Sequence, residues 1–375
     1  MGLALSLLTL VLTADAGAPP ARPAPPQVVS PQVGPDRRVT FHLRAPVAKE
    51  VLLTATFSKD KLRLTRDPQG IWTIVVGPID PGVYEYGFWV DGYRVLDPMN
   101  PHAKPQRTLS SSVLEVPGTP PLITELQDVP HGTLHVHEYR ARALDGKLRQ
   151  VTIYTPPGYE KKAGTRYPVL VLLPGLYEND SAWTGFGRGH HMLDNLLAQG
   201  KARPMVVVMP DGNAIPVDGE APPERVREAL RALERDLLDE VLPLVEQHYR
   251  VRTYAAGRAI AGLSSGGQRA LYVGLTHTDK FSWVLSFSSA TPRDLVEPVL
   301  TDAAALNKKL HWLWIGCGRE DPLYKRISDF SGWLDGKGIK HVWRTVDGGH
   351  AWPTWRAQFL ETIPQLFAPS GKPRG

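Results

Sequence analysis

The sequence contains a single cysteine, Cys317, among 375 residues. This count excludes an internal disulfide framework and any metal site built from several cysteines. An excess of one charge is also missing, because 43 basic and 38 acidic residues leave a net charge of +5 and the basic residues form no run of five. We therefore expect no nucleic-acid footprint. No internal stretch is apolar over the length that a membrane-spanning helix needs, so no membrane span is expected.

The composition that is present indicates packed globular structure. Hydrophobic residues make up 42% and charged residues 22% of the chain, and its length fits two domains. The apolar run Leu3–Leu12, followed by Ala-Asp-Ala at 14–16, resembles a secretory signal peptide, although no basic residue precedes it. An apolar tail or a misassigned start codon is the alternative. We predict a signal peptide at 1–18, a proline-rich linker at 19–35, and a secreted or periplasmic protein.

Residues 36–118 show the pattern of a small β-sandwich. Apolar and polar residues alternate from Val39 to Leu43, as in a half-buried strand. The turn sequence Asp-Pro-Gln-Gly at 67–70 and the Asp91-Gly92 pair separate further segments of this kind. Short strands with regular turns and no helical period favour a sandwich. The remaining expected strands are 51–57, 71–76, 83–90 and 112–116.

Aromatic residues gather in this first part of the chain. The stretch PGVYEYGFWVD at 81–91, together with Trp72, resembles the early-set, immunoglobulin-like domains that precede many carbohydrate-active enzymes. Some domains of that kind bind glycans on exposed aromatic rings, which makes Trp72, Trp89 and Tyr93 candidates for glycan contact. The alternative, which we favour, places these rings in the core or at a domain interface, because aromatic side chains are mostly buried.

The pattern changes to alternating strands and helices in residues 129–370. The continuous apolar runs Val169–Leu173 and Met205–Met209 fit strands that are buried on both faces of a parallel sheet. Between such runs, 223–249 carries apolar residues at helical spacing. This alternation predicts an α/β catalytic domain with a mostly parallel sheet and helices on both faces. Other expected strands are 134–140, 150–155, 259–262, 283–287, 310–315 and 340–346.

The pentapeptide GLSSG at 262–266 matches the G-x-S-x-G pattern. An apolar strand precedes it and a helix is expected after it, which is the context of a nucleophile elbow with Ser264 at the apex. The glycines on either side give the sharp turn room, and the backbone N–H of Ser265 can face a developing oxyanion. Ser265 is the rival nucleophile, but Leu263, two positions before it, would crowd the turn. A glycine- and serine-rich loop without chemistry is the remaining alternative.

A nucleophilic serine needs a base and an acid, and in this fold they follow it in the order acid, then histidine. His350 lies in the loop after the last expected strand, where the carboxyl edge of a sheet delivers a base; the other downstream histidines are His277, His311 and His341. The loop after the strand at 310–315 offers both Glu320 and Asp321 as the acid. The shorter Asp321 side chain, just before a proline, favours Asp321. Cys317, in the same loop, is expected to be a buried spectator.

The second oxyanion donor is expected from the loop after the first buried strand, which reads LPGLY at 173–177. Leu176 N–H is the candidate, although a simple turn would have the same sequence. Tyr177 is a candidate substrate-binding residue. Trp352, two residues after His350, is the other, because a rigid indole can form a flat wall for an aromatic or sugar ring. Packing of the last helix on the sheet is the alternative for Trp352 and Trp355.

These motifs together resemble the esterase D-like family of secreted α/β-hydrolases, from about residue 129 to the end. That family includes feruloyl esterases, enterochelin-esterase-like proteins and mycolyltransferases. The resemblance implies an α/β-hydrolase fold, supports Asp321 over Glu320, and implies neither a metal nor an organic cofactor. The matching pieces are TPPGY at 155–159, LPG at 173–175, VVMPDG at 207–212, GLSSGG at 262–267, GCGRED at 316–321 and GGHAWPTWR at 348–356.

The resulting functional hypothesis is a serine carboxylesterase that acts through Ser264, His350 and Asp321 by way of an acyl-enzyme. The expected partner is a small-molecule or polysaccharide ester, with a feruloyl or acetyl ester on plant polysaccharide as the first candidate. A siderophore ester is the next candidate. Two other functions remain as alternatives. An acyltransferase would use the same three residues to transfer the acyl group to a sugar or alcohol, and a non-catalytic glycan-binding protein would have lost activity at this site.

Overall fold

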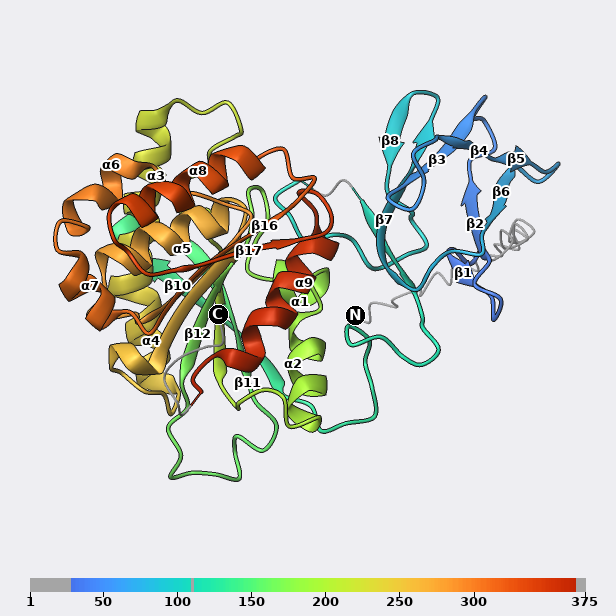
Figure 1. The fold of residues 1–375 in the computed structure, drawn as a ribbon. Helices are drawn as coiled ribbons and strands as arrows, with labels where there is room; N and C mark the ends of the chain where they lie inside the picture. Colours follow the sequence, from blue (N-terminus) through green and yellow to red (C-terminus); the bar gives the residue numbers. More distant parts are fainter. Residues whose placement is uncertain (1–27, 109–110, 369–375) are drawn as a thin grey trace, which may run out of the picture.

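The computed structural model describes residues 28–108 and 111–368. The expected signal peptide and the first part of the expected linker lie outside these residues. The chain forms a small β-sandwich followed by a larger α/β unit, and the two lie side by side (Figure 1). Within the described ranges, no helix is both long and apolar enough to cross a membrane.

The β-sandwich packs two antiparallel sheets around one apolar core. Strands β2 (Val39–Arg44) and β3 (Val51–Ala55) bury alternate residues, and the rings of Phe41 and Tyr86 meet edge to face at 5.0 Å in the core. Strand β1 lies inside the segment expected as linker, so this sandwich begins earlier than the composition indicates. One sheet has the order β1 (Gln32–Val33), β2 (Val39–Arg44), β6 (Ile71–Val76), β5 (Thr65–Arg66); the other has the order β4 (Leu62–Arg63), β3 (Val51–Ala55), β7 (Gly82–Val90), β8 (Tyr93–Val95), with β9 (Ser112–Val116) paired to β7.

The larger unit is built on an eight-stranded mixed sheet. Its first two strands, β10 and β11, run antiparallel, and β12 to β17 are parallel to one another. The α/β-hydrolase fold predicted from the sequence is thereby confirmed. The strand order is β10 (Thr133–Ala141), β11 (Lys147–Thr155), β13 (Val206–Pro210), β12 (Val169–Leu173), β14 (Arg258–Leu263), β15 (Trp283–Phe287), β16 (Trp312–Gly318), β17 (Val342–Val346).

Helices cover both faces of this sheet, which explains why the central strands read as continuous apolar runs. Alternate residues of β12 belong to two different cores: Val171 points to one and Leu172 to the other. The first core is shared with α3 (Pro223–Asp236), α5 (Ser265–Thr276), α7 (Ala303–Lys309) and α8 (Tyr324–Gly336). The second core is shared with α1 (Ala182–Gly185), α2 (Gly189–Ala198) and α9 (Trp352–Thr362).

The helix expected over 223–249 is continuous but not regular. α3 passes through one wider turn at Leu237–Val241 into α4 (Leu242–His248). Pro243 is the second residue of α4 and has no backbone N–H to donate to the preceding turn, which accounts for the change of hydrogen-bond register.

The two units share apolar contacts. Val83 of β7 and Val113 of β9 belong to the same core as α1, α2 and α9. The sandwich therefore rests on the helix layer that contains α9, which follows His350. The boundaries 36–118 and 129–370 remain predictions of two separately folding domains.

Candidate active site

The nucleophile elbow lies between β14 and α5. Ser264 has φ 52° and ψ −124°, a sparsely populated conformation for a residue with a side chain. The turn closes because Gly262 carries no side chain: a Cβ there would lie 2.4 Å from the backbone of Gly266. The backbone N–H of Ser264 donates to Phe287 O at 2.8 Å. This bond to β15 holds the strained residue at the carboxyl edge of the sheet.

Ser264, His350 and Asp321 come together from three separate loops. Ser264 Oγ lies 2.8 Å from His350 Nε2, and His350 Nδ1 lies 2.8 Å from Asp321 Oδ2. The Asp321 side chain is fully buried, and its other oxygen accepts the Leu323 N–H at 2.8 Å. A carboxylate on Nδ1 favours the tautomer with hydrogen on Nδ1, which leaves Nε2 free to accept the serine proton.

Glu320, the rival acid, faces a different group. Its carboxylate accepts the backbone N–H of Gly348, and the side chain is on the exposed surface. The loop after β16 thus directs one carboxylate to His350 and the other to the turn before it. Of the two carboxylates, only Asp321 contacts the imidazole.

Leu176 and Ser265, the expected oxyanion donors, line the same cavity as Ser264. Neither backbone N–H donates to an acceptor within the described residues, whereas the neighbouring Gly175 N–H donates to Glu178 Oε2 at 2.9 Å. The Leu176 and Ser265 amides thus stay available to an oxygen bound beside the serine. That role is a prediction, which the uncommitted amides support.

The cavity beside Ser264 has a volume of about 510 Å³ and a mixed polar and aliphatic lining. Arg326 and the Arg227–Asp294 ion pair place charge along it. No aromatic side chain is among the described residues that line it. The lining residues are Leu176, Gly219, Ala221, Pro223, Val226, Arg227, Ser264, Ser265, Gln268, Ser289, Ala290, Pro292, Leu323, Arg326 and Ile327.

Trp352 does not form a wall of this cavity, which corrects the expectation from its place next to His350. The helix α9 begins at Trp352 and turns the indole inward, so the residue is 3% exposed. Its ring meets those of Trp183 at 5.1 Å and Phe186 at 5.8 Å, both edge to face. Its Nε1–H donates to Glu178 Oε1 at 2.9 Å. The alternative expectation, that Trp352 packs the last helix on the sheet, therefore describes this indole.

Tyr177 lies on a shallow depression next to the cavity, lined also by Arg107 and Val217. It has φ 65° and is 44% exposed, and its hydroxyl accepts the Gly219 N–H at 3.2 Å. Because Gly219 also lines the cavity of Ser264, Tyr177 is placed at the rim. Substrate contact by Tyr177 stays a prediction.

A buried arginine that the sequence analysis missed supports the elbow from behind. Arg269 is 3% exposed and donates to Ser265 Oγ at 3.1 Å and to Asn213 Oδ1 at 3.0 Å. Asn213 in turn donates to Glu178 O at 2.6 Å, so the loops after β12 and β13 and the start of α5 are joined. Burial lowers the pKa of Arg269 to about 10. The sequence analysis could not identify Arg269, because an arginine within a helical segment is normally expected at the surface.

Cys317, expected to be a buried spectator, is indeed buried. Burial, the main cause, and the charge of the nearby Asp321 carboxylate, the second cause, raise the pKa of its thiol to about 12.

In the sandwich, Trp72 is 6% exposed and donates to Ala45 O, whereas Tyr93 is 79% exposed. Glycan contact at Tyr93 stays a prediction, and burial argues against it at Trp72. Across 28–108 and 111–368, no group of histidine, cysteine, aspartate and glutamate residues could hold a metal ion.

Comparisons with known proteins show the family and the fold of the chain. A family described as "Putative esterase" matches residues 142–366. An endo-1,4-β-xylanase/feruloyl esterase of Xylanibacter ruminicola is 28% identical over 347 residues, which cover 90% of this chain and 46% of the relative. The chain spans about half the length of the curated relatives it matches.

Solved structures share the fold. A ferulic acid esterase is 25% identical, with a TM-score of 0.54, over 63% of this chain and 98% of its own. An enterobactin esterase of Shigella flexneri, solved in the presence of enterobactin, is 21% identical with a TM-score of 0.61, over 89% of this chain and 93% of its own. The second likeness extends beyond the α/β unit, because it covers most of the chain.

Proposed function

Because the chain belongs to the Esterase family, we propose that it is a serine carboxylesterase whose catalytic residues are Ser264, His350 and Asp321. The hydrogen-bonded series Ser264–His350–Asp321 beside an open cavity carries this proposal. Each of the three groups is placed as its role requires. The Ser264 hydroxyl is held on a strained turn, one imidazole nitrogen of His350 faces that hydroxyl, and the buried Asp321 carboxylate contacts the other nitrogen.

In the proposed mechanism, Ser264 Oγ attacks the ester carbonyl carbon while its proton passes to His350 Nε2. The carbonyl oxygen becomes an oxyanion, which accepts hydrogen bonds from the backbone N–H groups of Leu176 and Ser265. The bond from the acyl carbon to the alkoxide oxygen then breaks, His350 gives the proton to that oxygen so that the alcohol departs, and the acyl group remains on Ser264 as the acyl-enzyme. Water, deprotonated by His350, attacks the acyl carbon, and Ser264 recovers its proton as the acid leaves. Asp321 keeps the imidazole oriented and stabilises its charged form.

For the substrate, we propose feruloyl or acetyl esters on plant polysaccharide. The relative from Xylanibacter ruminicola, named a xylanase and feruloyl esterase, supports this class, and its match covers 90% of the chain. The likeness to the enterobactin esterase over most of the chain favours a siderophore ester as the second candidate. For either class we propose action outside the cytoplasm, which fractionation of cells expressing the full chain would test.

The deciding experiment is a panel of esters hydrolysed by the purified protein: methyl ferulate, feruloylated and acetylated xylo-oligosaccharides, a catecholoyl-serine lactone and a short-chain nitrophenyl ester. We expect hydrolysis of the nitrophenyl ester and of one natural class. Adding excess sugar as acceptor separates transfer from hydrolysis by the product formed. Failure to cleave any ester would refute the esterase proposal and favour the non-catalytic glycan-binding protein.

Two neighbouring serines provide a matched pair of variants for that panel. Ser264→Ala removes the nucleophile, and we expect kcat/KM to fall by about 10⁴-fold or more. Ser265→Ala keeps the backbone N–H, so kcat/KM should stay within several-fold of the wild type. A fluorophosphonate probe should label the wild type and Ser265→Ala but not Ser264→Ala. The reverse pattern would assign the nucleophile to Ser265.

A further inference from the structure

The segment between β8 and β9 of the sandwich reaches across to the loop after β12. Its backbone lies alongside that loop: the Arg107 N–H donates to Tyr177 O at 2.7 Å, and Gln106 forms an antiparallel bridge with Glu178. The Arg107 guanidinium lies 5.3 Å from the centre of the Tyr177 ring. The loop that carries Leu176 is therefore in direct contact with a segment of the first unit.

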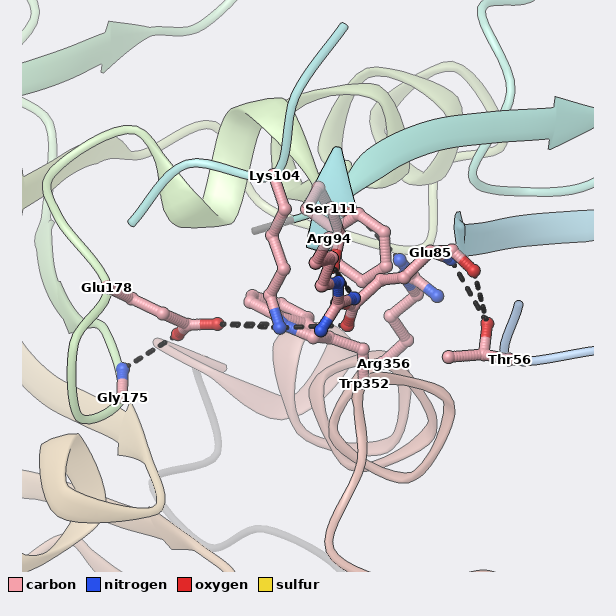
Figure 2. Close-up of polar contacts among 10 residues, drawn as sticks. Thr56, Glu85, Arg94, Lys104, Ser111, Gly175, Glu178, Trp352 and Arg356 are labelled. Carbon is pink, nitrogen blue, oxygen red and sulfur yellow. Dashed lines mark hydrogen bonds and ion pairs between the residues drawn. The ribbon is translucent and has the colours of Figure 1, made fainter. Parts of the chain in front are cut away.

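Lys104, in this segment, lies between carboxylates of the two units, as Figure 2 shows. Its Nζ donates to Glu85 Oε1 of β7 at 2.8 Å and lies 4.0 Å from Glu178 Oε1. The Lys104 side chain is 15% exposed. Little solvent screens an ion pair in such a position, so its effect on the buried partner is larger than that of a surface pair.

Glu178 uses both carboxylate oxygens on groups near the catalytic residues. Oε2 accepts the Gly175 N–H and Oε1 accepts the Trp352 Nε1–H, each at 2.9 Å (Figure 2). Gly175 precedes the oxyanion donor Leu176, and Trp352 follows the base His350 by two residues. One buried carboxylate thus ties the oxyanion loop to the start of α9.

Only the ionised form of Glu178 suits both donors. Burial raises the pKa of Glu178, and the charge of Lys104 opposes that rise. A protonated carboxyl would be a weaker acceptor on its hydroxyl oxygen, so the hydrogen bond from one of the two N–H groups would be weakened. The cation that favours the ionised form comes from the first unit of the chain.

We propose that Lys104 is a positioning residue, through which the segment between β8 and β9 of the β-sandwich keeps the oxyanion loop and α9 in their catalytic arrangement by pairing with Glu178. The inference rests on the proposed esterase function for its effect on rate. It gives the first unit a role in the chemistry of the second one. Neither the sequence motifs nor the comparisons assign such a role to Lys104.

Other charged groups surround the pair and must be held constant. Glu85 faces Lys104 from β7, and its charge raises the pKa of Glu178 further. Arg356 of α9 lies behind the indole, 5.7 Å from the centre of the Trp352 ring. Arg188 and Glu115 form an ion pair at 2.7 Å, and the charges of both act on that arginine. None of these is changed in the variants below.

The test compares the pH profiles of kcat and KM, on the nitrophenyl ester, for Lys104→Met, Lys104→Arg and the control Lys337→Met. Lys337 pairs with Glu297 on the surface, so its variant also removes one lysine from an ion pair. For Lys104→Met we expect kcat at pH 6 to fall by up to about 10-fold, because the loop is displaced while KM changes little. The acidic limb of the profile should move up by about one pH unit, so activity recovers at higher pH.

Lys104→Arg should keep the limb of the wild type, and the control variant should match the wild type throughout. Glu178→Gln removes the titrating group, so adding Lys104→Met to it should produce no further shift of the limb. A Lys104→Met profile that coincides with the wild type would refute the inference. A loss of kcat that is equal at every pH would also refute it, since the pairing with Glu178 would then not be its cause.

A second measurement does not depend on activity. The Trp352 indole N–H resonance, assigned by its absence in Trp352→Phe, should titrate with Glu178 in an NMR spectrum of the full chain. Its midpoint should lie higher in Lys104→Met than in the wild type, and an unchanged midpoint would overturn the pairing. If no ester is cleaved by the wild type, the esterase proposal fails, while this titration still decides the role of Lys104.

Discussion

Gly266 lies directly against Pro174: a Cβ built on Gly266 would be 2.4 Å from the Pro174 carbonyl oxygen. The first turn of α5 therefore touches the backbone of the loop that carries Leu176. This contact sets the separation between the two amides proposed to bind the oxyanion. The glycine after the serine is needed for close approach between two backbones, not for a left-handed conformation, because the positive φ belongs to Ser264.

Gly266→Ala should push the loop away from the elbow. We expect a loss of kcat of roughly 100-fold or more, and a destabilisation of about 1–3 kcal/mol from overpacking. Gly332→Ala is the matched control, because a Cβ at this α8 position meets no atom within 4 Å. That control should leave activity unchanged and raise the free energy of unfolding slightly. Equal behaviour of the two variants would disprove the contact.

The two acids after β16 can be separated by isosteric substitution. Asp321→Asn should lower kcat by about 10⁴-fold, because an amide facing His350 Nδ1 favours the wrong tautomer. Glu320→Gln keeps an oxygen that can accept the Gly348 N–H, so kcat should change by less than several-fold. Steady-state kinetics with circular dichroism as a folding check would measure both. A greater loss at Glu320 would reverse the assignment.

Trp352→Ala should act on folding and positioning and not on substrate preference. Removing a buried indole from the cluster with Trp183 and Phe186 is expected to cost about 3–5 kcal/mol of unfolding free energy. Activity on an aryl ester and on a small acetate ester should fall by the same factor. Tyr177→Ala, at the exposed rim, should leave the melting temperature nearly unchanged. A selective loss on the aryl ester in Trp352→Ala would restore its role as a pocket wall.

The Cys317 thiol should be unreactive in the native protein. Its pKa of about 12 leaves very little thiolate at pH 8, and the side chain is buried. A chromogenic disulfide reagent should therefore detect almost no thiol before guanidinium is added and one per chain afterwards. The thiol should gain reactivity only as the pH approaches 12 or the chain unfolds. Rapid reaction at pH 8 in buffer would show that the end of β16, which carries Cys317, opens.

Local patterns were sufficient for the longer strands and for their order along the chain. The alternation from Val39 to Leu43 became β2, and the apolar runs at 169–173 and 205–209 became β12 and β13. Period and burial are properties of short segments, so they can be seen in the sequence. The short strands β1, β4, β5 and β8 were missed because segments of two or three residues show no period.

Candidate catalytic residues could be named from the sequence because the order serine, acid, histidine along the chain leaves few choices. The motif around Ser264 singles out one serine, and few histidines follow it. The structure places that serine, His350 and Asp321 within hydrogen-bond distance. Their catalytic roles remain a prediction until the variants are measured. Trp352 shows the limit of such reasoning, since nearness to His350 in the chain did not place its ring in the cavity.

The sequence by itself determined the two kinds of structure, the elbow and the set of polar side chains available to it, because these depend on neighbours within a few residues. Only the tertiary structure decided which buried charges meet. Lys104 and Glu178 are 74 positions apart, and their pairing depends on how the sandwich rests against α9. The same holds for Arg269 and Asn213. Burial and pairing of charges arise from packing between distant segments, which leaves no local period in the chain.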